Sequence, residues 1–335
     1  MTKLMRKFLH LGFPYNLFIS GKQTQRNKLA LDDLTTHIFR HKAILAIFLL
    51  LLVSSSSIAQ NWDQVIKASA SDRAWRYQPD REANDYFGAS VAIDGNYAIV
   101  GAYLQEDAGG TTPFQGGTAL LFKKNASGQW LFLKKLKPAD LAGNENFGYS
   151  VAINGNTIVI GAINEDEDAA GGATLASAGS AYIFSKDQGG TDNWGQVKKI
   201  VASDRSADDQ FGNSVSISGN YIVVGAPKED EDASGGATDP DAGSAYVFYK
   251  DQGGTNNWGE VKKIVPSDRL GSDQFGNSVS ISGSNIVVGA WGQDSDAAGA
   301  NSLQQAGAAY VFSKDAGGTD NWGQVKKTGR FRQSR

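Results

Sequence analysis

The chain of 335 residues has no cysteine, and its three histidines, His10, His37 and His41, all lie near the N-terminus. Neither residue type occurs beyond residue 59. This absence excludes disulfides, cysteine nucleophiles and a lipid-modified cysteine from that part of the chain. It also excludes zinc and copper sites and the Ser-His-Asp arrangement, because these need residues that are missing.

The chain also has no long apolar run, since the longest one covers eleven residues from Ala43 to Val53. A helix needs about 20 apolar residues to cross a bilayer. Arg40-His41-Lys42 precedes the run and Ser57-x-Ala59 follows it, which is typical of a secretory signal cleaved after Ala59. We therefore predict a secreted or cell-surface protein, with an uncleaved membrane anchor as the alternative. We assign no function to residues 1–40.

Positive charge is scarce once residues 1–59 are removed. The remainder has 24 basic and 33 acidic residues, a net charge of −9. An acidic protein of this kind is a poor candidate for binding nucleic acid or an anionic membrane. We therefore predict no nucleic-acid partner, and contact with a membrane only if the signal segment stays attached.

What the chain does contain is a unit that occurs four times. Each unit begins with a Phe-Gly pair, at residues 87–88, 147–148, 211–212 and 275–276, so the spacings are 60, 64 and 64 residues. Repetition with such a period indicates a repeat architecture. In the third unit the predicted strands are Phe211–Ser218, Tyr221–Ala226, Ser244–Tyr249 and Trp258–Ile264. They are short runs of β-branched and aromatic residues bounded by Gly, Asn, Asp and Ser.

The apolar pattern predicts how these strands are buried. Val215 and Ile217 alternate with serines, as in a strand with one buried face. Residues 222–224 are apolar without alternation, which predicts burial on both faces. No segment favours a helix. A four-stranded antiparallel sheet with two apolar faces needs neighbours on both sides, so we predict an all-β protein, a β-propeller of four-stranded blades.

The motifs Phe211-Gly-x-Ser-Val215, Ile222-Val-Val-Gly-Ala226 and Ala245-Tyr-Val-Phe248 resemble the FG-GAP repeat, found in the β-propeller of integrin α-subunits and in bacterial surface proteins. The full element Gly225-Ala226-Pro227 occurs in the third unit only. The resemblance implies an extracellular propeller that serves recognition, often with seven blades. Many such repeats have a calcium loop between their first two strands. Here that place holds short turns such as Ser218-Gly219-Asn220, so we expect that calcium site to be absent.

The resemblance divides the chain as follows: an N-terminal extension with the signal (1–59), a lone fourth strand with its lead-in (60–86), four blades (87–146, 147–210, 211–274 and 275–327) and a tail that leaves the pattern (328–335). The lone strand, Asn61–Lys67, competes with the fourth unit's own last strand for one sheet edge. Two interpretations follow, namely an incomplete propeller or a four-bladed ring with a spare strand. We favour the incomplete one.

Acidic loops between the second and third strands are candidate metal sites. The pairs are in register with the repeat: Asp166 and Asp168, Asp230 and Asp232, Asp294 and Asp296. Clustered carboxylates on a Gly-rich turn suit Ca²⁺, although the spacing is only half of an EF-hand loop. The alternative is a solvated acidic loop that keeps the protein soluble, which we favour.

Other recurring residues have structural interpretations. Trp194, Trp258 and Trp322 end Gly-rich loops, where they could stack on a sugar ring, but their recurrence favours a cover between adjacent blades. The Phe-Gly pairs are predicted to fill the gaps between blades. Ser-Asp-Arg at residues 71–73, 203–205 and 267–269 is predicted to form a repeated turn with a local ion pair.

Taken together, the sequence predicts a secreted or cell-surface module for binding or adhesion, without enzymatic activity. Its partner would be an unidentified extracellular protein or glycan, and calcium would be its only candidate cofactor. One alternative is a truncated structural fragment of a larger surface protein. The other is a polysaccharide-acting enzyme with paired carboxylates, the chemistry still open without histidine and cysteine.

Overall fold

The computed structural model describes residues 84–106, 114–236, 238–296 and 303–329. These ranges belong to the second of two compact units, residues 66–335. They contain strands and turns and no helix, which confirms the all-β prediction, so the described ranges also lack any helix long and apolar enough to span a membrane. The predicted signal and the lone strand at Asn61–Lys67 lie outside these ranges.

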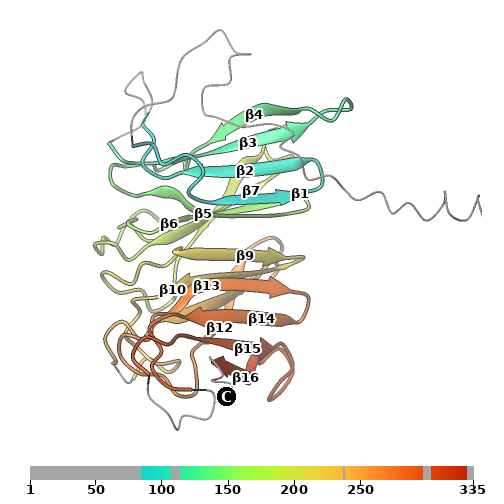
Figure 1. Cartoon of the computed structure of the whole chain (residues 1–335). Helices are drawn as coiled ribbons and strands as arrows, with labels where there is room; N and C mark the ends of the chain where they lie inside the picture. The colour runs from blue at the N-terminus through green and yellow to red at the C-terminus, as the bar shows by residue number, and fades with distance from the viewer. Residues whose placement is uncertain (1–83, 107–113, 237, 297–302, 330–335) are drawn as a thin grey trace, which may run out of the picture. The chain divides into compact units, whose positions relative to one another are not determined.

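The strands form four antiparallel sheets in which chain neighbours pair (Figure 1). The first and second sheets are β1 (Val91–Asp94), β2 (Tyr97–Ala102), β3 (Thr118–Lys124) and β4 (Trp130–Leu136), then β5 (Phe147–Asn154), β6 (Thr157–Ala162), β7 (Ser180–Ser185) and β8 (Gly195–Ile200). The third and fourth are β9 (Ser214–Ser218), β10 (Tyr221–Ala226), β11 (Ser244–Tyr249) and β12 (Gly259–Ile264), then β13 (Phe275–Ser282), β14 (Asn285–Ala290), β15 (Ala308–Ser313) and β16 (Gly323–Gly329).

Two-residue turns join the first two strands of each sheet, as the Gly-Asn signature predicts. In the third sheet, Ser218 pairs with Tyr221 across Gly219-Asn220. The turns of successive sheets are also linked, because the Gly219 amide donates to Asn154 Oδ1 at 2.8 Å. The repeat therefore fixes both the hairpins and their position against the preceding sheet.

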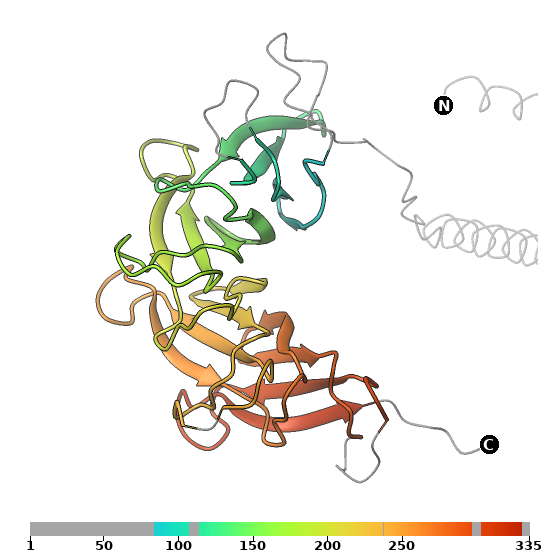
Figure 2. The same ribbon diagram turned by 90° about the vertical axis from the view of Figure 1, so that its left-hand side faces the viewer.

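Each sheet has two faces, which we call front and back. The front face packs on the preceding sheet, and in the third sheet it includes Ile222, Val224 and Tyr246. The back face packs on the following sheet and includes Val223 and Val247. Three clusters of buried residues join the first sheet to the second, the second to the third and the third to the fourth. Figure 2 shows the sheets following one another in chain order.

The burial of individual strands agrees with the sequence pattern. Residues 222–224 are fully buried, so both faces of β10 are covered, whereas only Val215 and Ile217 are buried in β9. The last strand differs from the prediction, because β16 continues past Lys327 to Gly329. Thr328 pairs with Ala309 there, in the place that Ile264 takes opposite Ala245.

Three of the four Phe-Gly pairs lie in the seams between sheets, as predicted, and the first pair does not. Phe147, Phe211 and Phe275 are fully buried, and each bridges to a glycine of the preceding sheet. The close approach explains the other glycines of the motif. A Cβ atom on Gly225 would lie 1.9 Å from the Gly276 carbonyl oxygen, so no larger residue fits unless the backbone moves.

Candidate functional site

The first aspartate of each acidic loop closes that loop. Asp166, Asp230 and Asp294 each accept a backbone N–H from the residue eleven positions later, at 2.8, 2.8 and 2.6 Å. Such a bond fixes the two ends of the loop against each other. These carboxylates therefore have a structural partner in all three repeats.

The second aspartate caps the turn that follows it. The Asp168 carboxylate accepts N–H bonds from Ala170, Gly172 and Ala173, and these bonds lower its pKa to about 2. Asp232 accepts the amides of Ser234 and Gly236 in the same way, and Asp296 also interacts within the chain. These bonds support the interpretation of a self-contained solvated loop. Calcium binding by the aspartate pairs stays a prediction.

Beneath the loop of the second repeat lies a buried group of acids. Glu145, Glu165 and Glu167 offer oxygens within 4.8 Å of one another, close enough to share a cation. The ammonium group of Lys199 supplies positive charge at this point, 3.0 Å from Glu165 and 3.0 Å from Asp140. A buried ammonium paired with two carboxylates satisfies most of the local charge.

The protonation of this group follows from its geometry. Burial and the charge of Glu165 raise the pKa of Glu145 to about 8. Although burial opposes it, hydrogen bonds from Glu167, Tyr182 and Lys199 lower the pKa of Glu165. Glu145 Oε1 accepts the amide of Ala142 at 2.6 Å, while its Oε2 is buried without a partner in the described residues. Glu145 is thus protonated at neutral pH and Glu165 is ionised.

The same arrangement recurs in the third repeat with the same charges. In the third repeat Glu229, Lys263 and Tyr246 take the places of Glu165, Lys199 and Tyr182, and burial raises the pKa of Asp209 to about 8.

In the fourth repeat Gln293 replaces the central glutamate and donates to Asp273 at 2.9 Å. Glutamate and glutamine both serve at this position, so it needs a hydrogen-bonding group more than a charge. We infer a structural role for these groups. Glu165 and Glu229 stand directly before the aspartates of these acidic loops in the sequence, yet both are fully buried.

The repeated tryptophans are buried rather than exposed. Trp194, Trp258 and Trp322 are each at most 3% exposed, and Trp194 packs edge-on against Tyr97 of the first sheet. This confirms that they cover the seam between sheets, and it leaves no indole face for a sugar.

Neither of the two described Ser-Asp-Arg turns, at residues 203–205 and 267–269, has the predicted local ion pair, so that prediction is wrong for them; the turn at residues 71–73 lies outside the described residues. Arg205 instead donates to the carbonyl oxygens of Ala173 and Asp166 in the acidic loop. Asp204 pairs with Lys263 of the third sheet at 2.7 Å and accepts the Tyr246 hydroxyl at 2.8 Å. The turn thus connects the acidic loop of one sheet to the core of the next.

A groove of about 570 Å³ runs along the first strands of the four sheets. Tyr103 and Tyr149 lie at one end of it, and their ring centres are 5.2 Å apart. Tyr86 continues the row, 5.2 Å from Tyr103. Serine and asparagine side chains line the remainder: Ser90, Ser150, Ser214, Asn213 and Asn277. The groove thus combines a row of aromatic rings with hydrogen-bonding groups.

The tyrosine row departs from the repeat. Where the first unit has Tyr103, the second and third have Ile163 and Pro227, and Tyr149 gives way to Asn213 in the third. Structural positions recur in every unit, whereas these do not. The irregular third residue of the Gly-Ala-x element was therefore the signal in the sequence, although its meaning depended on which strands line the groove.

A family model described as the FG-GAP repeat matches residues 77–119, 130–184, 194–248 and 258–312. The second to fourth matches start at or just before the last strand of a sheet and end within the third strand of the next. The family unit therefore spans a seam between sheets. A search of curated proteins gave no match.

Proposed function

We propose that this chain, which belongs to the FG-GAP repeat family, is a secreted or cell-surface binding module that acts without catalysis. The observation that supports this proposal is the groove lined by the paired rings of Tyr103 and Tyr149. Scaffold residues recur in each unit, but the tyrosines do not, as expected for residues kept for a ligand. A propeller scaffold by itself serves many functions, so the residues of the site determine the ligand.

The chemistry of the groove favours a glycan. Flat aromatic faces pack against the apolar face of a sugar ring, and nearby hydroxyl and amide groups bond its hydroxyls. The serine hydroxyls of the groove donate to glycine carbonyls of the next sheet, for example Ser150 to Gly212 at 2.7 Å. Each hydroxyl oxygen keeps a lone pair that can accept a bond from a ligand.

The test is binding of the purified chain to a panel of extracellular polysaccharides, followed by calorimetry on each ligand found. We expect Tyr103→Ala and Tyr149→Ala to weaken binding at least about fivefold, since loss of an aromatic contact costs about 1 kcal/mol or more. Phe114→Ala removes an exposed aromatic of the same repeat that does not line the groove, and it should bind normally. Equal affinity of all three variants would contradict the proposal.

The enzymatic alternative needs a pair of carboxylates that could act as acid and base. The buried acids recur in two repeats and pair with Lys199 and Lys263, which supports a role in the scaffold instead. A hydrolysis assay on the same panel tests this point. Activity that is lost in an Asp230→Asn variant would overturn the non-enzymatic proposal.

Two further parts of the proposal have simple tests. Secretion predicts a mature protein that begins at Gln60, which N-terminal sequencing of the exported chain would show. Calcium binding by the acidic loops predicts heat on titration and a higher melting temperature, both reduced in an Asp168→Asn, Asp232→Asn double variant. Absence of heat and of a thermal shift would remove the metal.

A further inference from the structure

The internal seams of the molecule share one design. In all three, the back face of one sheet meets the front face of the next, and one serine reaches across. Ser90, Ser150 and Ser214 donate to the carbonyl oxygens of Gly148, Gly212 and Gly276 at 2.9, 2.7 and 2.8 Å. A front face and a back face from this chain are therefore complementary surfaces.

The front face of the first sheet is exposed along its first strand, although Val100, Leu120 and Phe122 on the same face are buried. Val91 and Ile93 are 69% and 66% exposed, whereas Val151 and Ile153, their counterparts in the second sheet, are each 8% exposed. Phe87 is half-buried, and Gly88 is exposed. Within the described residues, the first Phe-Gly pair, Phe87-Gly88, thus has no preceding sheet to pack against.

The back face of the fourth sheet is uncovered as well. Val287 is 42% exposed, while Val159 and Val223 at the same position are fully buried. Among the described residues, no buried cluster joins this face to the first sheet. Within the described residues, the molecule therefore ends in a front face that is free along its first strand and in a free back face.

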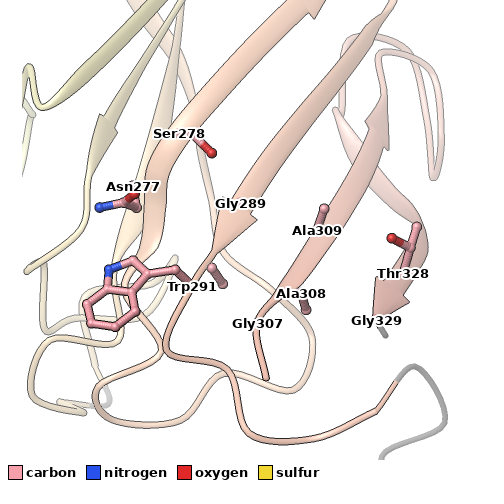
Figure 3. A pocket seen from close by; sticks show the side chains of 10 residues that line it. Asn277, Ser278, Gly289, Trp291, Gly307, Ala308, Ala309, Thr328 and Gly329 are labelled. Carbon is pink, nitrogen blue, oxygen red and sulfur yellow. The ribbon is translucent and has the colours of Figure 1, made fainter. Parts of the chain in front are cut away.

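A hollow of about 430 Å³ lies on the free back face (Figure 3). Ser278, Gly289 and Gly307 line it, and their counterparts Ser214, Gly225 and Gly243 all contact the Phe-Gly pair of the next sheet. Within the described residues, Ser278 lacks the glycine carbonyl that the other three serines bond. The hollow therefore has the same lining that contacts a Phe-Gly pair in each internal seam. Within the described residues, no Phe-Gly pair fills it.

We propose that a second copy of this chain occupies the hollow. Its Phe87-Gly88 pair would pack there as the other three Phe-Gly pairs pack in the internal seams. In this arrangement Ile93 of the second copy packs against Val287. Their counterparts in the third seam, Ile281 and Val223, belong to one buried cluster. It also covers two exposed aromatic residues, Trp291 beside the hollow and Tyr86 beside Phe87.

Polar groups at the rim fit the same pairing. Lys134, Lys198 and Lys262 bond the asparagine that precedes the tryptophan of the next sheet: Asn193, Asn257 and Asn321. On the free back face, Lys326 corresponds to these lysines. On the free front face, Gln129 corresponds to the asparagines that they bond. The partner is thus a chain with the same repeat, and the contact runs head to tail, which gives a ring when the rotation closes.

The test measures the mass of the full chain by light scattering over a range of concentrations. We expect a dimer or a larger closed assembly for the unaltered chain. Ile93→Asp and Val287→Asp each bury a charge in the contact and should raise the dissociation constant at least about 100-fold. Val197→Asp places the same charge at an exposed site on the second sheet and should associate normally.

Mixing the two variants gives the decisive result. The Ile93→Asp chain keeps its back face and the Val287→Asp chain keeps its front face, so an equimolar mixture should form a heterodimer through one intact contact. Circular dichroism checks folding, and Tyr86→Asp with Trp291→Asp replaces the pair if either variant fails to fold. A monomeric unaltered chain, variants that associate normally, or a mixture without heterodimer would overturn the proposal.

Discussion

Replacement of Glu145 by glutamine is expected to stabilise the fold at neutral pH and to change little near pH 4. Glu145 is 2% exposed, and burial beside the charge of Glu165 raises its pKa from 4.5 to about 8. Between these two values the unfolded chain has lost the proton and the folded chain has kept it. The stability of the unaltered protein therefore falls as the pH rises through this window.

The magnitude follows from the size of the shift. A change of 1 in the pKa corresponds to about 1.4 kcal/mol. At pH 7 the free energy of unfolding is therefore lower by about 3 kcal/mol because the folded protein keeps Glu145 neutral. Glutamine removes that loss, because it is neutral in both states. Its carbonyl can still accept the Ala142 amide, and its NH₂ group replaces the proton of the carboxyl as a donor.

Urea unfolding at pH 4, 5.5, 7 and 8 measures the effect. The gain of Glu145→Gln should grow over this whole range. Asp273→Asn is the matched variant, since burial raises the pKa of Asp273 only to about 6, so its gain should stop growing above that pH. A gain that does not depend on pH, or a loss of stability at pH 7, would refute the protonation argument.

Three other substitutions test the seams. Gly225→Ala should destabilise by about 3 kcal/mol or more, because its Cβ would lie 1.9 Å from a backbone oxygen, while Gly219→Ala meets no atom within 4 Å and should cost about 1 kcal/mol by thermal unfolding. Lys199→Met leaves Glu165 buried without its cation, and chemical denaturation should show a loss of about 3 to 5 kcal/mol at pH 7; a neutral result would contradict the charge assignment. Trp194→Ala should cost about 3 to 5 kcal/mol in the same assay, and a cost below 1 kcal/mol would mean that the indole is not buried.

Much of the fold could be predicted because local signals agree with the repeat. Residues 222–224 have no polar neighbour along the strand, and the two-residue turn at Gly219-Asn220 fixes the register of the hairpin. Both features depend only on nearby residues. The role of Phe211 was also predictable, since a large apolar residue beside glycine at every seam has few other uses.

The site was harder to predict because it depends on contacts between units. Glu165 lies in an acidic stretch that favours a solvated loop, and its burial depends on Tyr182 and Lys199, which follow 17 and 34 positions later. Arg205 was expected to pair with its neighbour, but the turn directs it to the carbonyl oxygens of the acidic loop. Tyr103 and Tyr149 stand 46 positions apart, and only the stacking of two sheets brings their rings together.

A double-mutant cycle across one seam tests directly whether successive sheets pack on each other. Tyr221 of the third sheet meets Trp322, on the loop before β16 of the fourth, with ring centres 5.3 Å apart in an edge-on arrangement. Unfolding free energies of Tyr221→Leu, Trp322→Leu and the double variant should give a coupling of about 0.5 to 1.5 kcal/mol. If the effects of the two substitutions add within about 0.3 kcal/mol, the third and fourth sheets do not pack on each other at this seam.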